Sequence, residues 1–271
     1  MSMIEMPAPA EIQAFKKTAL EAAHVGGDIL KKYAESGFKI EHKSRLSLVT
    51  DADKASEHAI VNLIQKAYPT HQILAEEKGM HSDHPSPYKW IIDPLDGTTN
   101  FAHSFPFYNV SIGLEFQNQC ILGIVLDPTR PELFVAEYGA GATCNGVPIR
   151  VSHVVELEKS LLVTGFGYDI RETLENNLDE FCRFTLLTQG VRRTGSAALD
   201  LCYVACGRFD GFWELKLNPW DTAAGVVILQ EAGGKLTNYE GQPYSIYGKK
   251  MVASNGLIHD QMLEVLQRSR S

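Results

Sequence analysis

The stretch from Trp90 to Asn100 constrains the fold of this chain more than any other part of it. Its first three residues are apolar and predict the end of a buried strand. Asp93-Pro94 and Asp96-Gly97 follow directly and are turn signals, so two carboxylates stand where the strand ends. Ligands bind at the carboxyl ends of strands in open α/β sheets. The stretch therefore predicts a ligand site at the edge of an α/β sheet.

The residues after these two acids supply hydrogen-bond donors. Gly97-Thr98-Thr99 presents backbone N–H groups as the chain turns into an expected helix, and a helix start of this kind favours an anion such as phosphate. A structural alternative exists, because Asp-Pro and Asp-Gly are common turn dipeptides and Asp caps helices. The combination of a strand, two acids, a glycine and two threonines favours a site for a cation and a phosphate.

Three further acids stand at the ends of predicted elements. Glu76 follows a predicted strand over residues 72–75, Glu214 ends a short predicted strand, and Asp221 begins a predicted helix. Taken alone, Glu76 would belong to a solvated acidic pair with Glu77, and Asp221 would be a helix N-cap. Their shared position at element ends indicates that they could reach the same pocket as the first two acids.

Two other positions leave both interpretations open. Asp53, three residues after a threonine, completes a pattern that resembles a capping box, so capping and function are equal alternatives there. Arg192 and Arg193 are adjacent, and arginines are usually surface charges. Because they precede Gly195-Ser196, an expected helix start, one of them could face a phosphate or sugar hydroxyls.

The chemistry of these acids points to a hard cation. Carboxylates gathered in one pocket raise each other's pKa unless a cation neutralises them. All the candidate ligands are oxygens, with no Cys or His among them, which favours Mg²⁺ over zinc. Two Mg²⁺ ions could activate water and stabilise the leaving oxygen in an in-line displacement on phosphorus.

The composition of the chain is that of a globular protein. Its 271 residues are 44% hydrophobic and 21% charged, long enough for one domain or two joined halves. The net charge of −8 gives no support to a nucleic-acid partner, and the five cysteines without a CxxC pair indicate buried free thiols. We see neither a signal peptide nor an apolar run near the ~20 residues of a membrane helix. We therefore expect a cytoplasmic protein.

Periodicity and turn signals predict alternating strands and helices. The expected strands cover residues 38–41, 72–75, 90–92, 110–116, 121–127, 133–138, 160–164, 211–214, 235–237 and 251–254. The expected helices cover residues 11–33, 174–187, 195–205, 220–231 and 257–268. Asn145-Gly146 predicts a hairpin. The Gly-rich segment Gly139–Ala142 lacks GxGxxG order and a following helix, so we interpret it as a structural turn.

Four segments resemble a known family. Asp93–Phe101 resembles the DP(I/L)DGTxNF signature of the inositol monophosphatase family. Ala75-Glu76-Glu77 resembles the family's GEE motif, with alanine in place of glycine, and Asn218–Gly225 resembles its second signature around WDxAAG. Arg192–Ala198 resembles the bacterial form of the segment before that signature. The motifs occur in the family's order and cover nearly the whole chain.

The resemblance implies a fold and an activity. The implied fold class is α/β (α+β layered), the αβαβα sandwich of the sugar phosphatases. It would be a single unit over residues 1–271, with an α+β half over about 1–155 and an α/β half over about 156–271. The implied activity is that of a magnesium-dependent inositol-1-monophosphatase that hydrolyses a small phosphate monoester. A homodimer and inhibition by lithium, which would take a magnesium position, are implied as well.

The resemblance also implies roles for individual residues. Glu76, Asp93 and the Leu95 carbonyl would bind one Mg²⁺, and Asp93, Asp96 and Asp221 a second, with two or three ions per site. The implied catalytic residues, which position the attacking water, are Glu76, Thr98 and Asp53. The implied phosphate and substrate contacts are Asp96, Gly97, Thr98, Arg192, Gly195, Ser196, Ala197, Glu214 and Asp221.

The sequence departs from the family's motifs at two positions, and these departures affect the expected substrate more than the expected chemistry. Ser47 stands where the family often has Asp, and Ala75 where it has Gly, but neither is an implied ligand. The same scaffold serves fructose 1,6-bisphosphate, adenosine 3′,5′-bisphosphate and histidinol phosphate. A bisphosphatase should bring extra basic side chains, and Arg192-Arg193 is the one conspicuous basic pair near a motif, which favours a monophosphate. Some bacterial members of the family are linked to transcription complexes, so a binding role with secondary catalysis is a further alternative.

Overall fold

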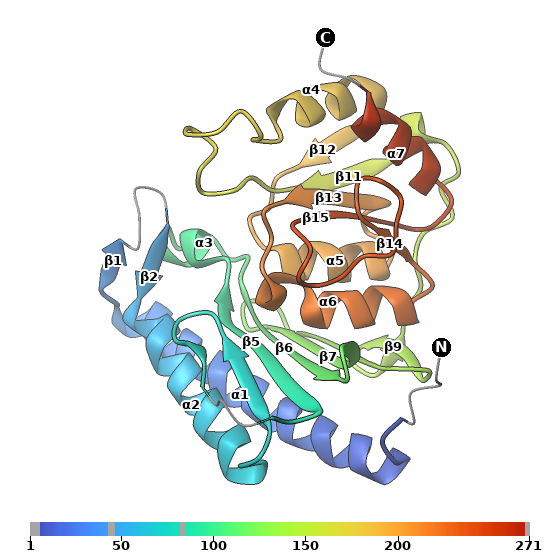
Figure 1. Cartoon of the computed structure of the whole chain (residues 1–271). Helices are drawn as coiled ribbons and strands as arrows, with labels where there is room; N and C mark the ends of the chain where they lie inside the picture. Colours follow the sequence, from blue (N-terminus) through green and yellow to red (C-terminus); the bar gives the residue numbers. More distant parts are fainter. Residues whose placement is uncertain (1–5, 43–46, 82–84, 269–271) are drawn as a thin grey trace.

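The computed structural model describes residues 6–42, 47–81 and 85–268, which form helices and three β-sheets (Figure 1). The α-helices of these residues are α1 (Pro9–Ser36), α2 (Asp51–Ala67), α3 (Thr98–Ala102), α4 (Leu178–Leu187), α5 (Ala197–Ala205), α6 (Pro219–Glu231) and α7 (His259–Gln267). The strands are β1 (Ile40–His42), β2 (Leu48–Thr50), β3 (Gln72–Ala75), β4 (Gly79–Met80), β5 (Tyr88–Asp96), β6 (Asn109–Phe116), β7 (Gln119–Asp127), β8 (Glu132–Glu137), β9 (Gly141–Cys144), β10 (Val147–Pro148), β11 (Leu161–Thr164), β12 (Gly190–Arg192), β13 (Gly211–Leu215), β14 (Lys235–Thr237) and β15 (Lys250–Ser254). A 3₁₀ helix, η1, spans Leu157–Lys159.

The elements stack in the order helix, sheet, helix, sheet, helix (Figure 1). Helices α1 and α2 pack on the outer face of an eight-stranded sheet, whose strand order is β10-β9-β8-β7-β6-β5-β3-β4. Helices α5 and α6 lie between this sheet and a five-stranded sheet of order β12-β11-β13-β15-β14. Helices α4 and α7 cover the far face of the five-stranded sheet. The predicted αβαβα sandwich is therefore confirmed.

The register of two parallel strand pairs brings distant acids to one edge. Strand β3 runs parallel to β5 with Ala75 opposite Ile92, so the next residues, Glu76 and Asp93, leave the sheet side by side. Strand β11 runs parallel to β13 and ends with Thr164 opposite Trp213. The segment after β11 therefore begins beside Glu214, because parallel strands end at the same edge of a sheet.

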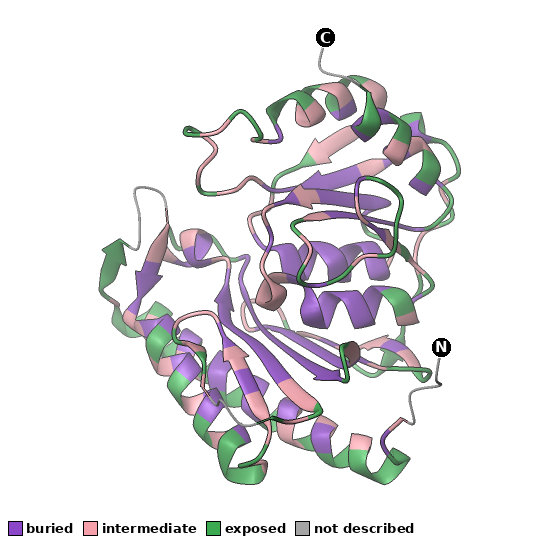
Figure 2. Cartoon of the chain, viewed as in Figure 1, coloured by how far each residue is buried: buried purple, intermediate pink, exposed green. Residues whose placement is uncertain are grey.

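Helix α6 is buried along most of its length, as Figure 2 shows for both central helices. Its apolar residues surround the whole helix rather than one stripe, which is typical of a helix enclosed between layers. A pair of glycines lets it lie close to the eight-stranded sheet. Gly113 and Gly123 face each other on β6 and β7, and a Cβ on Gly123 would lie 2.3 Å from the Ala224 carbonyl oxygen. The close packing of α6 on Gly113 and Gly123 therefore helps to position the N-terminus of α6 and, with it, Asp221.

Several local predictions are confirmed. Strands β6, β7 and β8 are successive antiparallel neighbours. Asn145 and Gly146 have positive φ angles of 52° and 76° and join β9 to β10 as a hairpin. The Gly-rich turn is structural, since the N–H groups of Gly139 and Gly141 donate to the Glu231 carboxylate at 2.7 and 2.8 Å.

Other local predictions were wrong. The expected helix over residues 174–187 begins only at Leu178, because Asn177 has a left-handed backbone and its side-chain amide donates to Thr164 and Gly165. Strand β12 was not predicted. The five cysteines are free, but only Cys202 is buried; Cys120, Cys144 and Cys206 are partly buried, and Cys182 is exposed on α4. That helix covers the outer face of the five-stranded sheet, and Cys182 is on its solvent side.

Within the described residues, no helix combines the length and apolar character needed to cross a membrane.

Replacing Gly123 with alanine should disturb the packing of α6 on the eight-stranded sheet. The new Cβ would meet the backbone of a helix, which has no side-chain rotation to relieve the 2.3 Å contact. Overpacking of this kind destabilises proteins by about 1–3 kcal/mol, so we expect Gly123→Ala to lower the melting temperature. Gly190→Ala is the control, because its Cβ would first meet the flexible end of Arg192, at 3.0 Å. Equal melting temperatures for the two variants would contradict the explanation that glycine at position 123 allows α6 to pack closely on the sheet.

Candidate active site

A cavity of about 340 Å³ lies where the carboxyl ends of β3, β5 and β13 face the N-terminal ends of α5 and α6. It gathers residues from segments that are far apart in the sequence. The predicted site residues that line it are Glu76, Asp93, Leu95, Asp96, Gly97, Thr98, Gly195, Ser196, Ala197, Glu214 and Asp221. Asp53 and Arg192 are not among the lining residues.

The turn at the end of β5 directs two carboxylates into this cavity. The pairing of β5 with β6 shifts register between Asp93 and Asp96, and Asp93 accepts a hydrogen bond from the Leu95 N–H at 3.0 Å. Burial raises the pKa of Asp93 well above its ordinary value, and the carboxylates of Glu76, Asp96 and Asp221 raise it further. A cation bound among these acids would remove the repulsion.

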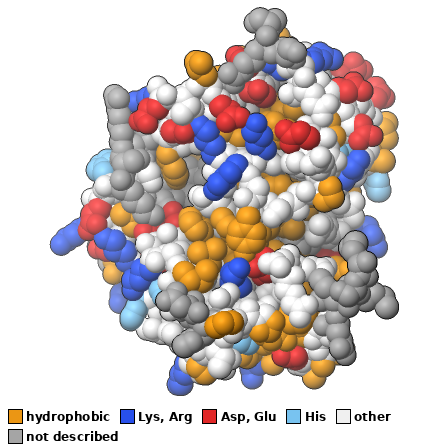
Figure 3. All heavy atoms as spheres, viewed as in Figure 1, with side chains coloured by type: hydrophobic (Ala, Val, Ile, Leu, Met, Phe, Trp, Pro, Cys, Tyr) orange, Lys and Arg blue, Asp and Glu red, His pale blue; other side chains and the backbone are white. Residues whose placement is uncertain are grey.

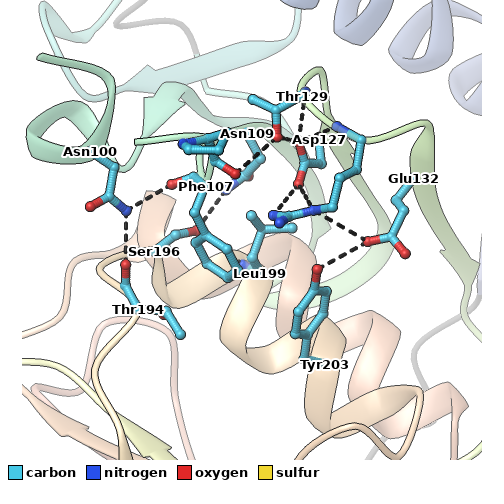
Figure 4. Close-up of polar contacts among 12 residues, drawn as sticks. Asn100, Phe107, Asn109, Asp127, Thr129, Glu132, Thr194, Ser196, Leu199 and Tyr203 are labelled. Carbon is cyan, nitrogen blue, oxygen red and sulfur yellow. Dashed lines mark hydrogen bonds and ion pairs between the residues drawn. The ribbon is translucent and has the colours of Figure 1, made fainter. Parts of the chain in front are cut away.

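Asp96 joins the eight-stranded sheet to helix α5. Its Oδ2 accepts hydrogen bonds from Ser196 Oγ at 2.7 Å, the Ala198 N–H at 2.9 Å and Asn109 Nδ2 at 3.2 Å. Asn109 also donates to Ser196 at 2.8 Å, a contact that Figure 4 shows. Burial raises the pKa of Asp96, although these hydrogen bonds oppose the increase. The carboxylate is therefore held in place by donors from both halves of the site.

A second bridge runs from α3 to the segment before α5. The Asn100 side-chain amide donates to the carbonyl oxygens of Phe107 and Thr194, each at 2.8 Å (Figure 4). The Thr194 hydroxyl in turn donates to Asp200, a buried acid at the cavity wall. This bridge fixes the loop that carries Gly195 next to the turn after β5.

Asp53 has the predicted capping position and also contacts a residue of the cavity. Its Oδ2 accepts from the Thr50 N–H at 2.8 Å and the Thr50 hydroxyl at 2.6 Å, which completes the capping box of α2. Its Oδ1 accepts from the Thr98 hydroxyl at 3.1 Å. Burial raises the pKa of Asp53 to about 6. Asp53 thus reaches the cavity through Thr98 without lining it.

Asp221 takes part in the capping box of α6 and also lines the cavity. Its Oδ2 accepts from the Asn218 N–H at 2.6 Å in a capping box at the start of α6. Burial raises its pKa well above the ordinary value, and the Asp96 and Glu76 carboxylates add to the increase. The helix N-terminus partly compensates this charge, because its free N–H groups favour an anion.

Sequence reasoning missed a buried acid that supports Glu76. Glu57 is 1% exposed on α2, and its Oε2 accepts from the Glu77 N–H at 2.8 Å. The Glu76 N–H donates to the Ile92 carbonyl at 3.2 Å, so the backbone on both sides of Glu76 is held. The available signal was position, because Glu57 lies on the buried face of α2 with Ile60.

Glu214 faces a segment that sequence reasoning also missed. Residues 165–169 line the cavity, and a Cβ on Gly165 would lie 2.3 Å from the Glu214 carboxylate. A side chain at this position would require the Glu214 carboxylate to move. Lys216 directly follows β13 and has a positive φ of 67°. Its ammonium donates to the Asp169 carboxylate at 2.6 Å and to the Thr173 hydroxyl at 2.7 Å. These contacts hold the segment against the cavity.

The structure separates the two adjacent arginines. Arg193 lines the cavity, whereas Arg192 ends β12 as an exposed residue whose guanidinium lies 3.4 Å from the Val191 carbonyl. Arg193, which directly follows β12, is the one of the two adjacent arginines that lines the cavity, and Arg192 is not among the lining residues.

The donors of the cavity fit a hard divalent cation. They are carboxylates and a backbone carbonyl, and burial, followed by mutual repulsion, raises the pKa values of Asp93 and Asp221. In the described ranges, no three His, Cys, Asp or Glu side chains are already arranged as a metal-binding group. The fit rests on the chemistry and burial of the donors, which suit Mg²⁺.

Comparisons with known proteins agree with this geometry. The sequence model of the inositol monophosphatase family matches residues 11–271. An inositol-1-monophosphatase of Synechocystis sp. is 48% identical over 259 residues, which cover 95% of this chain and 90% of the relative. A Nus factor SuhB of Pseudomonas aeruginosa is 40% identical, with 94% and 97% covered. The structure of inositol monophosphatase from Anabaena (Nostoc) sp. PCC 7120 matches with a TM-score of 0.88 at 48% identity, over 96% of this chain and 98% of that chain.

The raised pKa of Glu214 should make stability depend on pH. Burial, then the Asp221 and Asp96 carboxylates, raise this pKa to about 8, with Arg193 acting in the opposite direction. At pH values between the pKa of Glu214 in the unfolded chain and about 8, the folded protein binds a proton that the unfolded chain lacks. The free energy of unfolding therefore rises as the pH falls through this range. We expect EDTA-treated protein to melt at higher temperature near pH 6 than near pH 9, and Glu214→Gln to flatten this profile. Glu21→Gln, at an exposed position of α1, is the control and should leave the pH dependence of the melting temperature unchanged. An identical slope in Glu214→Gln and wild type would refute the assignment.

Proposed function

The chain belongs to the inositol monophosphatase family of phosphatases, and we propose that it is a Mg²⁺-dependent phosphomonoesterase for inositol 1-phosphate or a similar polyol or sugar monophosphate. The observation that carries this proposal is the meeting of Glu76, Asp93, Asp96 and Asp221 in one cavity beside helix N-termini. Carboxylates there suit magnesium, and the helix N-termini suit a phosphate.

The acids divide into two proposed ligand groups. Glu76, Asp93 and the Leu95 carbonyl would hold one Mg²⁺, and Asp93, Asp96 and Asp221 would hold a second. Bound Mg²⁺ would lower the pKa of a water molecule and neutralise charge on the phosphate. The protein's part is to keep these oxygens in place, which the hydrogen bonds to Asp93, Asp96 and Asp221 accomplish.

Thr98, Asp53 and Glu76 are proposed to orient the attacking water. Thr98 donates its hydroxyl proton to Asp53, so its oxygen can accept a hydrogen bond from the water. Glu76 would accept the water's proton as the oxygen attacks phosphorus. The P–O bond to the alcohol would break on the opposite side, and the leaving oxygen would take a proton from a solvent water molecule. The pKa of about 6 at Asp53 is near the range that suits proton transfer at neutral pH.

The substrate would lie between the turn after β5 and the start of α5. The backbone of Gly97 and Thr98 would bind the phosphate with Arg193 nearby, while Glu214 and the segment Gly195–Ala197 would contact ring hydroxyls. Glu214 is a hydrogen-bond partner for hydroxyls in either protonation state. Lys216 is already engaged by Asp169 and Thr173, which favours a single phosphate over a bisphosphate.

A second candidate role rests on the 40% identity to the protein named Nus factor SuhB. We propose from this likeness that the chain also associates with a transcription complex. Family likeness further supports a homodimer, a cytoplasmic location and inhibition by lithium. Recovery of transcription proteins with a catalytically inactive Asp93→Asn bait would separate the binding role from hydrolysis.

Released phosphate, measured over a panel of substrates, tests the main proposal. We expect turnover of inositol 1-phosphate with Mg²⁺, loss of turnover in EDTA, and recovery on adding Mg²⁺. The panel should include fructose 1,6-bisphosphate, adenosine 3′,5′-bisphosphate and histidinol phosphate as the alternative substrates. Full turnover after exhaustive EDTA treatment would rule out the metal-dependent mechanism, and preference for a bisphosphate would replace the proposed substrate class.

Glu76→Gln should abolish most turnover without unfolding the protein. The change removes a proposed ligand and a proton acceptor, and acid–base assistance alone is worth about 10²–10⁴ in rate. Glu77→Gln is the matched control, because Glu57 contacts the backbone N–H of Glu77 and that contact survives the substitution. We expect kcat to fall in Glu76→Gln and to change little in Glu77→Gln, with similar melting temperatures. A kcat for Glu76→Gln within about threefold of wild type, far less than that range, would exclude the role.

A further inference from the structure

A second cavity, of about 420 Å³, lies beside β13 in the C-terminal half of the chain. Leu215 lines both this cavity and the candidate active site. Helix α4 contributes Glu180 to its wall, α7 contributes Leu266, and Tyr239 follows β14. The proposed hydrolysis uses none of these side chains.

Two polar atoms in the wall of this cavity are buried without a hydrogen-bond partner among the described residues. They are the Tyr239 hydroxyl and Glu180 Oε2. Tyr239 is only 9% exposed, and its ring packs in an apolar cluster with Trp213 and Met262. A buried polar atom that lacks a partner costs about 1–3 kcal/mol. A ligand that donates hydrogen bonds to both oxygens would remove this cost.

The charge of the wall favours a cationic ligand. Glu175, Glu180 and Glu240 line the cavity, against Lys250 as the basic residue among the described lining residues. The Lys250 ammonium pairs with Glu175 at 2.6 Å and lies 5.8 Å from the centre of the Tyr239 ring. Over the upper part of the face in Figure 3, acidic and basic side chains are interspersed, so the preference for a cation comes from the residues that line the cavity. An anion would meet an excess of negative charge here.

We propose that this cavity binds a small organic ammonium ion, such as a short alkyl diamine, through Glu180 and Tyr239. An ammonium group has three N–H donors and no acceptor, which matches two oxygen atoms that need donors. Leu215 and Leu266 provide apolar surface for an alkyl chain, and the volume is far larger than a bare metal ion needs.

Calorimetric titration of the full chain with 1,4-diaminobutane tests this proposal. Mg²⁺ and inorganic phosphate are kept in excess so that the diamine does not bind at the acids of the active site. We expect saturable binding. We expect Tyr239→Phe and Glu180→Gln each to weaken it by about 10–100-fold, the effect of losing a hydrogen bond to a charged group. Glu264→Gln, an exposed acid of α7 outside the cavity, is the matched control and should bind as wild type does.

Three results would overturn the proposal. They are the absence of saturable binding, equal affinity in wild type, Tyr239→Phe and Glu180→Gln, or displacement of the diamine by equimolar Ca²⁺, which would identify a metal site. Tyr239→Phe removes one unpaired hydroxyl and should fold normally, and Glu180→Gln tests the same site from another helix. Because binding is measured without turnover, a failure here is distinct from a failure of the proposed hydrolysis.

Discussion

The removal of several carboxylates from water into one cavity is the constraint on which the candidate site depends. Burial is the first cause of the raised pKa values of these acids, which are Asp93, Asp96, Glu214 and Asp221. Backbone N–H groups of Leu95, Ala198 and Asn218 each donate to one of them. Such donors are available only where strands end and helices begin. The order of the layers therefore determines how much negative charge the cavity can hold.

The layers can supply these donors because their backbones approach closely. The Gly113–Gly123 pair lets α6 lie against the eight-stranded sheet, and Gly165 makes room for the Glu214 carboxylate. A side chain at Gly123 would press on the backbone of α6, and one at Gly165 would displace the Glu214 carboxylate. Small residues away from the acids are thus as necessary to the site as the acids themselves.

The sequence predicted the parts of the site that are set by local chemistry. The turn after β5 and the capping box at Asp53 depend on residues within a few positions of one another, so the pattern of residue types was sufficient. Asp221 was predicted as the N-cap of its helix, but the N-cap is Asn218 and Asp221 closes the capping box from the third helical position. The choice between Arg192 and Arg193 depends on the register of β12 against β11, which no local pattern reveals. Glu57 and the residues 165–169 act through contacts between distant elements, and these required the folded structure.

The contacts of Asp96 have a consequence for when the site can exist. Ser196, which donates to Asp96, is 100 residues further along the chain. During synthesis the acids of β5 therefore leave the ribosome long before the helix that holds one of them. A chain without α5 would carry Asp96 without its donors Ser196 and Ala198. The proposed second ligand group, which also needs Asp221 at the start of α6, could then form only once both central helices have packed on the sheet.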